Sequence, residues 1–217
     1  MFKTPKDTDM NKYENELHSK GIKYVCGVDE VGRGPLCGPV VTCAVILPEN
    51  YDLPGLTDSK QLSEKKRNKY YEILIHDPNV IYAIGEDSPK RIDEINIREA
   101  SKEAMIKAIN SLSIKPEHVL VDAMNLDIDI PNTAIIHGDA LSISIAAASV
   151  IAKVTRDNMM YELDKKYPEY DYKKNKGYPT KEHIEAIKKY GVKDFYRFTF
   201  SPVSEIIKQI DEGNQDR

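Results

Sequence analysis

The chain has 217 residues, of which 41% are hydrophobic and 30% charged, proportions that are ordinary for a soluble protein with one substantial core. Its net charge of −4 excludes a protein that is basic overall, so a bound polyanion would need local basic patches. No apolar run approaches the about 20 residues of a membrane helix, and residues 1–21 lack the apolar core of a secretory signal. We therefore expect a cytoplasmic protein that binds no membrane.

Cysteine usage agrees with that compartment. Cys26, Cys37 and Cys43 are an odd number of thiols, without the CxxC spacing of a zinc site, and two of them lie in apolar segments. They are expected to be buried free thiols of a reducing compartment.

In chain order, the pattern first predicts a short polar helix over residues 9–20 that ends at Gly21. Apolar strands follow over residues 22–31 and 38–47, and the short glycine-rich link between them favours an antiparallel pair. The later elements are expected as follows: a helix over 63–76 capped by Ser63, a strand over 80–85, one long helix over 88–112, strands over 118–122 and 133–137, a long buried helix from Ser142, a helix from Thr180 to Gly191, and a last helix over 203–211.

This order predicts an α/β protein. Early strands form a meander and later strands are joined through a helical crossover, which gives a mixed sheet with helices on both faces. In such a sheet the strands that end at Asp29 and Asp122 can be neighbours.

Acidic residues follow several of these strands. Asp29 and Glu30 end the first strand, Asp122 ends a second, and Asp139 precedes the long buried helix. Oxygen ligands without His or Cys suit Mg²⁺ or Mn²⁺, and several carboxylates suit a two-metal site that hydrolyses a phosphodiester. Taken singly, Asp122 could instead form a turn, Asp139 could cap a helix, and an Asp-Glu pair is common on surfaces.

Two basic clusters could supply the nucleic-acid contact. The first has five cations against Glu64, a local charge of +4: Lys60, Lys65, Lys66, Arg67 and Lys69. The second has six cations against Glu169 and Asp171, again +4: Lys165, Lys166, Lys173, Lys174, Lys176 and Lys181. Tyr167, Tyr170, Tyr172 and Tyr178 interleave with the second cluster and could stack on sugars or bases. The alternative for each cluster is a solvated surface.

Several motifs together resemble the ribonuclease HII family. They are Asp29-Glu30-Val31-Gly32-Arg33-Gly34-Pro35-Leu36-Cys37-Gly38-Pro39-Val40, Asp58-Ser59-Lys60-Gln61-Leu62-Ser63, Val121-Asp122-Ala123-Met124-Asn125, Gly138-Asp139-Ala140, residues 146–157, and Gly177-Tyr178-Pro179-Thr180. They occur in the family's order from about residue 24 to residue 203, which is most of the chain.

The resemblance implies an RNase H-like fold: an N-terminal extension over 1–21, a catalytic core over 22–167, and a helical C-terminal segment over 168–217 that packs on the core and helps to bind substrate. It implies a Mn²⁺- or Mg²⁺-dependent endonuclease that cuts RNA in RNA–DNA hybrids. Single ribonucleotides embedded in duplex DNA would be cut on their 5′ side, leaving 3′-hydroxyl and 5′-phosphate ends. A monomer is the default expectation.

The resemblance also implies roles for individual residues. The metal ligands and catalytic residues would be Asp29, Glu30, Asp122 and Asp139. The backbone of Gly32, Arg33 and Gly34 would read the 2′-hydroxyl, Lys60 would contact a phosphate, and Tyr178 would stack on the deoxyribose after the ribonucleotide. A 2′-hydroxyl is what distinguishes RNA from DNA at one position, and glycines allow the backbone to approach it.

The chain departs from the family pattern in two places. Tyr196-Arg197 replaces a His-Arg pair, and Ala123 replaces a glycine, which puts contacts of the C-terminal segment in doubt. Only 28 residues precede Asp29, so type 2 is preferred over the type 3 enzymes, which carry an extra N-terminal domain. Alternative functions are another RNase H-like nuclease acting on DNA, or a non-catalytic nucleic-acid-binding module.

Other polar residues near these motifs receive structural interpretations. Asp127 and Asp129 are expected in an exposed edge or loop. His137 is expected on the strand before Asp139, in a structural position. Asp157 is expected to form a helical salt bridge or to support the site indirectly, and not to bind metal.

Overall fold

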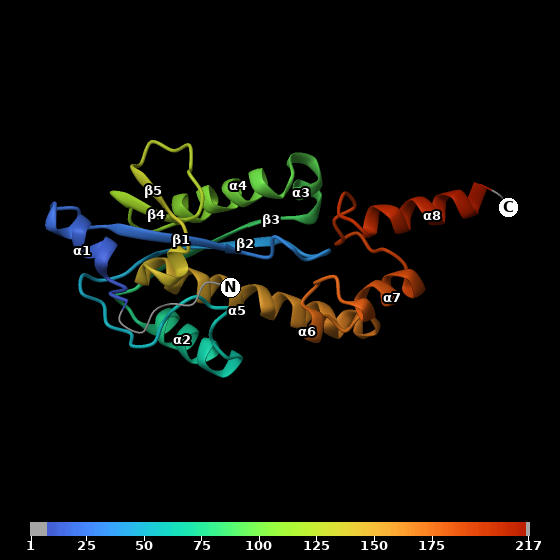
Figure 1. The fold of residues 1–217 in the computed structure, drawn as a ribbon, viewed down its shortest axis with the longest axis horizontal. Coiled ribbons are helices and arrows are strands. Elements are labelled where there is room, and N and C mark those ends of the chain that lie inside the picture. The colour runs from blue at the N-terminus through green and yellow to red at the C-terminus, as the bar shows by residue number, and fades with distance from the viewer. Residues whose placement is uncertain (1–7, 216–217) are drawn as a thin grey trace.

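The computed structural model describes residues 8–215, which form a mixed five-stranded sheet flanked by helices (Figure 1). The strand order is β3-β2-β1-β4-β5. The strands are β1 Val25–Val31, β2 Val40–Ile46, β3 Ile81–Asp87, β4 His118–Asp122 and β5 Asn132–Ile135. The predicted fold class is confirmed.

Strand pairing places two of the predicted acids side by side. β1 and β2 are antiparallel, as the short link between them predicts, and β1 is parallel to β4. In that register Val28 pairs with Val121, so Asp29 and Asp122 follow at the same end of neighbouring strands.

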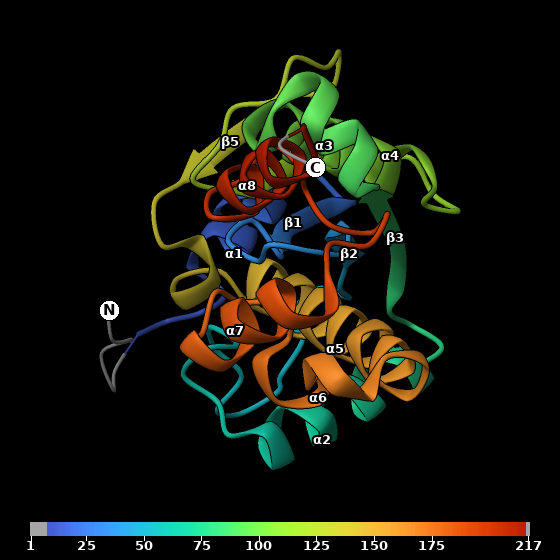
Figure 2. The same cartoon turned by 90° about the vertical axis from the view of Figure 1, so that its right-hand side faces the viewer.

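Helices cover both faces of the sheet. α4 and α3 lie on one face, and α5 and α2 lie on the other (Figures 1 and 2). The helices are α1 Lys12–Ser19, α2 Glu64–His76, α3 Pro89–Ile95, α4 Ile97–Asn110, α5 Ile143–Lys166, α6 Tyr172–Asn175, α7 Lys181–Tyr190 and α8 Val203–Gln215, with 3₁₀ turns η1 Gly138–Ala140 and η2 Pro168–Tyr170. Ser63, the predicted N-cap of α2, and Ser142 and Thr180, at the predicted starts of α5 and α7, each accept a hydrogen bond from a backbone N–H of their helix.

The first half of α5 is the buried centre of the molecule. Its small residues 146–148 are fully buried beside Val41, Cys43 and Val45 of β2. A side chain at Gly27 would collide with the backbone of Ser144, so this glycine lets the start of α5 lie directly on β1. The predicted burial of this helix is confirmed, and all three cysteines are buried and free as expected.

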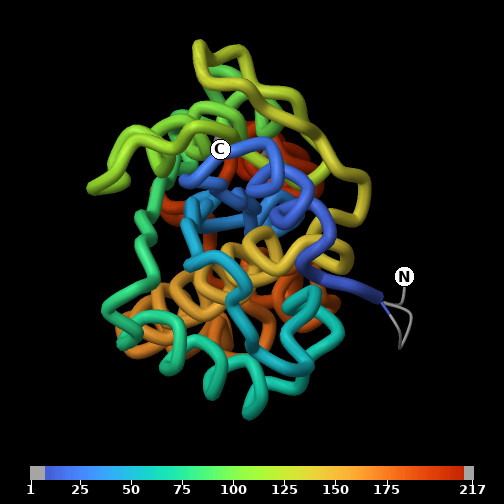
Figure 3. The backbone as a smooth tube through the Cα atoms, turned by 90° about the vertical axis from the view of Figure 1, so that its left-hand side faces the viewer, coloured from blue at the N-terminus to red at the C-terminus, as the bar shows by residue number. Residues whose placement is uncertain are grey.

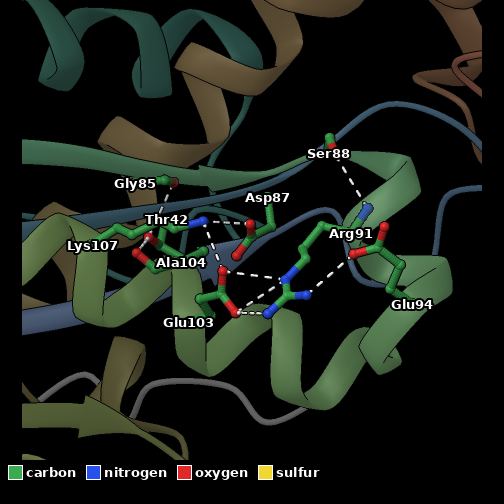
Figure 4. A network of polar contacts seen from close by, with 9 residues as sticks. All are labelled: Thr42, Gly85, Asp87, Ser88, Arg91, Glu94, Glu103, Ala104 and Lys107. Carbon is green, nitrogen blue, oxygen red and sulfur yellow. Dashed lines mark hydrogen bonds and ion pairs between the residues drawn. The ribbon is translucent and has the colours of Figure 1, made fainter.

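Polar contacts attach α4 to the other face. The hydroxyl of Thr42 donates to the carbonyls of Gly85 and Ala104, which join β2, β3 and α4 (Figure 4). At the end of β3, Asp87 accepts from Lys107 at 2.6 Å. Because these groups have partners in the protein, α4 is held in a fixed position against the sheet.

Two predicted elements are wrong in detail. The helix over 88–112 is interrupted at Asn96, whose φ of 69° is left-handed and whose side chain accepts from the N–H groups of Arg98 and Glu99. The Asn96 side chain therefore begins a new helix, α4. The strand predicted over 133–137 ends at Ile135, and His137 has a φ of 58° and is exposed, so it is not a strand residue.

The segment from α6 to α8 lies at the end of the sheet where the β1–β2 loop emerges, and α1 lies at the opposite end (Figures 2 and 3). Its core is aromatic: Tyr170, Tyr172 and Tyr196 are at most 1% exposed, and the Tyr172 and Tyr196 hydroxyls are 2.6 Å apart. Tyr170 and Tyr172 therefore form a core, and the expectation that they stack on nucleic acid is wrong. Among the described residues, no helix is apolar over a length sufficient to cross a membrane.

Candidate active site

Three of the four predicted acids meet at one point. Asp29 comes from β1, Asp122 ends β4, and Asp139 lies in the short turn that leads into α5. One carboxylate oxygen from each lies within 4.8 Å of the others. Asp29 shares the α5 face of β1 with Gly27 because side chains alternate along a strand.

Backbone N–H groups orient these carboxylates. Asp122 Oδ1 accepts from the Gly138 N–H at 2.7 Å, which ties the end of β4 to the turn that carries Asp139. Asp29 Oδ1 accepts from the Glu30 N–H at 2.7 Å. The site thus has a fixed geometry before any ligand binds.

The electrostatics of the cluster suit a bound cation. Burial, and then the charges of Glu30, Asp122 and Asp139, raise the pKa of Asp29 well above its ordinary value. Burial and the neighbouring Asp58 raise the pKa of Asp139 to about 7. A divalent cation would relieve both effects, and a set of oxygen donors fits Mg²⁺ or Mn²⁺.

Glu30 lies apart from this cluster, on the other face of β1. The strand neighbours that share its face, Cys26 and Val28, belong to the core beneath α4. Glu30 Oε1 lies 3.6 Å from Nη1 of Arg33, and its buried Oε2 has no partner among the described residues. Burial raises the pKa of Glu30 to about 7. A buried carboxylate oxygen without a partner can accept a cation or a donor from a ligand.

Lys60 reaches the cluster from the segment before α2. Burial would lower the pKa of Lys60, but the carboxylates of Asp29 and Asp58 outweigh it and raise the pKa above its ordinary value. Asp58 is 6% exposed, accepts from the Lys60 N–H at 2.8 Å, and shares a side-chain hydrogen bond with Asp139. Asp58 received no role from the sequence, although it opens the motif that contains Lys60.

Arg197 holds the glycine loop after β1. It is fully buried and donates to the carbonyls of Gly32 at 2.6 Å, Arg33 at 2.9 Å and Gly38 at 3.0 Å. A buried guanidinium is stable here because backbone carbonyls satisfy its N–H groups. The Tyr196-Arg197 departure therefore keeps the arginine in a structural role.

Arg156 of α5 donates hydrogen bonds to the same loop. It is also fully buried, and it donates to Pro39, Cys37 and Lys176 at 3.0–3.1 Å. Gly32 has a φ of 93°, and a side chain there would collide with Arg156. The sequence pattern predicted a buried role for neither arginine, and it placed Arg156 where α5 emerges toward solvent, because their partners are carbonyls far away in the chain.

Tyr178 joins this loop from the C-terminal segment. An added Cβ at Gly34 would lie 3.4 Å from the Tyr178 ring, which is 39% exposed. The Leu36 N–H donates to the Gly177 carbonyl at 2.8 Å, and the Tyr178 carbonyl lies 2.8 Å from His183 Nδ1. The predicted glycine loop and tyrosine are therefore adjacent, and hydrogen bonds hold the backbone that carries the ring.

The remaining polar residues divide as follows. Asp157 pairs with Lys153 at 2.6 Å, which confirms the predicted helical salt bridge. Asp127 and Asp129 lie in an exposed loop, as expected. His137 is exposed and lies outside the strand, so the strand position predicted for it is wrong, and its structural role stays a prediction.

Comparisons with known proteins agree with this geometry. The family model described as Ribonuclease HII matches residues 26–203. A Bacillus cytotoxicus protein named Ribonuclease HII is 56% identical over 200 residues, which cover 92% of this chain and 77% of the relative. A Bacillus mycoides protein of the same name is 54% identical over 201 residues, 93% of this chain and 78% of that one.

Solved structures share the fold. The crystal structure of ribonuclease H2 from Pyrococcus horikoshii has a TM-score of 0.74 at 31% identity, covering 87% of this chain and 99% of that one. RNase HII from Archaeoglobus fulgidus, solved in complex with PCNA, has a TM-score of 0.68 at 25% identity, covering 82% and 95%. Bst-RNase HIII in complex with Mn²⁺ is 16% identical with a TM-score of 0.68, covering 90% of this chain and 72% of that one, and shows the shared fold alone.

The mixed sheet and these likenesses define a hydrolase of the ribonuclease H class, which acts on nucleic acid. More narrowly, the chain belongs to the ribonuclease HII family.

Proposed function

We propose that this protein is a metal-dependent endonuclease that cuts the RNA strand of RNA–DNA hybrids and single ribonucleotides embedded in duplex DNA. The observation that carries the proposal is the position of three acids within 4.8 Å of one another, at the strand end from which the loop of Gly32 and Gly34 emerges. A non-catalytic binding module would have no use for this cluster, because unneutralised carboxylates repel phosphates.

Asp29, Asp122 and Asp139 would hold the metal, with Glu30 as a fourth ligand from the other face of β1. Mn²⁺ and Mg²⁺ both suit these oxygens. Two-metal-ion hydrolysis is the proposed chemistry, in which bound metal supplies activation of water and stabilisation of the leaving oxygen. The backbone contacts of Asp29 and Asp122 would keep their carboxylates in place through the reaction. The products would carry 3′-hydroxyl and 5′-phosphate ends.

The loop of Gly32, Arg33 and Gly34 would read the 2′-hydroxyl. Arg197 donates hydrogen bonds to the carbonyls of Gly32 and Arg33 and so restrains the loop backbone. A restrained backbone cannot move closer to a sugar that lacks the 2′-hydroxyl. A rigid backbone contact of this kind can reject a sugar that lacks the hydroxyl. Selectivity for a ribonucleotide would follow from that rigidity.

Tyr178 and Lys60 would place the strand. The exposed Tyr178 ring beside Gly34 would stack on the deoxyribose that follows the ribonucleotide. Lys60, which faces the acid cluster, would contact a phosphate. Residues 168–217, which carry Tyr178, would then form a substrate-binding segment on the catalytic core, in a protein that acts as a monomer.

A panel of labelled duplexes tests this function. One duplex carries a single ribonucleotide, one is a continuous RNA–DNA hybrid, and one is plain DNA of the same sequence, each incubated with Mg²⁺, with Mn²⁺ or with chelator. We expect cleavage of the first two only, only with metal, and on the 5′ side of the ribonucleotide. Cleavage of plain DNA would favour another RNase H-like nuclease, and binding without cleavage would favour a non-catalytic module.

A further inference from the structure

A second concave site lies beside the acid cluster, on the α4 side of the sheet. Its volume is about 370 Å³, at the lower end of the range for ligand pockets. It is lined by Arg33, Arg98, Lys102, Ala123, Met124 and Asn125. Ala123 directly follows Asp122, so the pocket opens next to the proposed catalytic centre.

The charge of this pocket is positive. Three of its lining side chains are cations, and no carboxylate is among its lining residues. Arg33 is 3.6 Å from Glu30, and Lys102 is 3.4 Å from Glu99, whereas Arg98 is exposed and forms no ion pair with any described residue. Arg98 is thus free to receive an anion from solvent.

The position of Arg98 does not serve the stability of its helix. It lies in the first turn of α4, which begins at Ile97. The N-terminus of a helix carries partial positive charge, which favours anions and disfavours a cation such as Arg98. A bound anion would offset this repulsion, and a second cation, Lys102, lies one turn further along the helix.

Lys60 and the pocket lie on opposite sides of the acids. Lys60 faces Asp29 and Asp139 on the α5 side, whereas Arg98 and Lys102 come from α4 on the other face of the sheet (Figure 1). The acid cluster therefore lies between two sources of positive charge. A nucleic-acid duplex that crosses the cluster can contact both.

We propose that this pocket binds a backbone phosphate of the substrate duplex, away from the phosphate that is cut. The proposal rests on the proposed nucleic-acid substrate and deepens it. Arg98 and Lys102 hold the phosphate from α4, Arg33 faces it from the glycine loop, and Asn125 contributes an amide donor. The contact fixes the angle at which the duplex crosses the acids.

The first test measures binding of a labelled plain DNA duplex, which needs no cleavage. Arg98→Gln and Lys102→Gln are compared with the wild type and with Lys115→Gln, which removes one exposed cation beyond the other end of α4. We expect roughly tenfold weaker binding for each pocket variant and a salt slope smaller by about 0.9, with Lys115→Gln near the wild type. Arg98→Gln should unfold no more easily than the wild type, because it removes a cation from a helix N-terminus.

The second test locates the phosphate. Duplexes with one ribonucleotide, which fixes the register, each carry a single uncharged methylphosphonate at a different backbone position. At one backbone position other than the cut phosphate, the methylphosphonate should lower the kcat/KM of the wild type. The same substitution should cause no further loss of kcat/KM in Arg98→Gln, which already lacks the contact.

Three results would overturn the proposal. If the pocket variants bind and cleave like the wild type, the pocket does not bind a substrate phosphate, and the proposed function is unaffected. An equal loss in Lys115→Gln would show a general effect of charge. A wild type that neither binds nor cleaves any duplex would end the proposed function and this proposal together.

Discussion

The Nη2 atom of Arg197 lies 2.6 Å from the carbonyl oxygen of Gly32, although the two residues are far apart in the chain. Through this contact the last part of the chain fixes the loop that follows the strand of Asp29. The fully buried side chain of Arg197 therefore holds the loop to which we assign specificity in place beside the proposed catalytic acids.

Arg197→Lys tests that frame. A lysine cannot reach Gly32, Arg33 and Gly38 together, so buried carbonyls lose their donors at a cost of about 1–3 kcal/mol in the free energy of unfolding. We also expect a lower ratio of ribonucleotide-containing to plain DNA binding. Urea titration and competition binding measure the two effects. The control is Arg91→Lys, whose partners Glu94 and Glu103 lie at the surface. If both substitutions lower the free energy of unfolding equally and leave the binding ratio unchanged, the contacts of Arg197 with the loop have no special role.

Tyr178→Ala should harm cleavage at a single embedded ribonucleotide more than cleavage within a long hybrid. Stacking on a sugar or base is typically worth about 1–3 kcal/mol, or roughly 5- to 150-fold in kcat/KM. A single ribonucleotide offers one RNA-to-DNA junction, whereas within continuous RNA the contact is already poor. The control, Tyr190→Ala, removes a similarly exposed ring of the same segment. Equal losses on both substrates would make Tyr178 a general positioning residue.

Metal binding should depend on pH through Asp139. Its pKa is raised to about 7, so in metal-free protein the folded state holds a proton that the unfolded state releases near its ordinary value of 3.8. That contribution to stability is present at low pH and is lost as pH rises through 7. Because metal must displace the proton, the gain in Tm on adding Mn²⁺ should be larger at pH 8 than at pH 6. A gain that does not change with pH in the wild type, or one that changes equally in Asp139→Asn, would contradict this.

Asp29→Asn should keep or raise Tm in metal-free buffer. Burial and three neighbouring carboxylates raise the pKa of Asp29, so a neutral amide relieves the cost of the charge. Thermal unfolding in chelator measures the effect. A large drop in Tm would show that the Asp29 carboxylate stabilises the fold, which would contradict its placement as an unfavourable buried charge that awaits a metal ion.

Glu14 should stabilise the start of α5. It is 5% exposed and accepts from the hydroxyls of Ser142 and Ser144 and from the Ser144 N–H at 3.0 Å. Glu14→Ala removes the acceptor of these three donors and leaves the two hydroxyls only their mutual contact at 3.3 Å, at a cost of about 2–3 kcal/mol in the free energy of unfolding. Glu16→Ala, an exposed change in the same helix, should have little effect in the same urea titration. Similar urea midpoints for the two variants would show that Glu14 does not stabilise the start of α5.

Local patterns in the sequence predict much of this fold. The strands are mostly apolar, and the caps at Ser63, Ser142 and Thr180 are short-range signals, so the elements and their order follow. The meeting of Asp29 with Asp122 follows from strand order. The break at Asn96 does not, because a single left-handed residue inside a helical pattern leaves no periodic trace.

The rest of the site depends on contacts distant in sequence. Arg156 and Arg197 resemble surface cations by residue type, and only the folded chain brings carbonyls to them. Tyr170 and Tyr172 resemble a stacking surface, yet they are buried against one another. The division of the Asp29-Glu30 pair between two faces of β1 follows from strand alternation, once the position of the strand is known.

The central claim is that these acids cut a phosphodiester at a ribonucleotide, and one matched pair of variants tests it most directly. Asp122→Asn and Asp127→Asn each remove one negative charge nearby in the sequence, but only Asp122 belongs to the cluster. With Mg²⁺ and a DNA duplex that contains one ribonucleotide, we expect turnover to be abolished in Asp122→Asn, with binding retained, and to stay normal in Asp127→Asn. Near-normal turnover in Asp122→Asn would contradict the account.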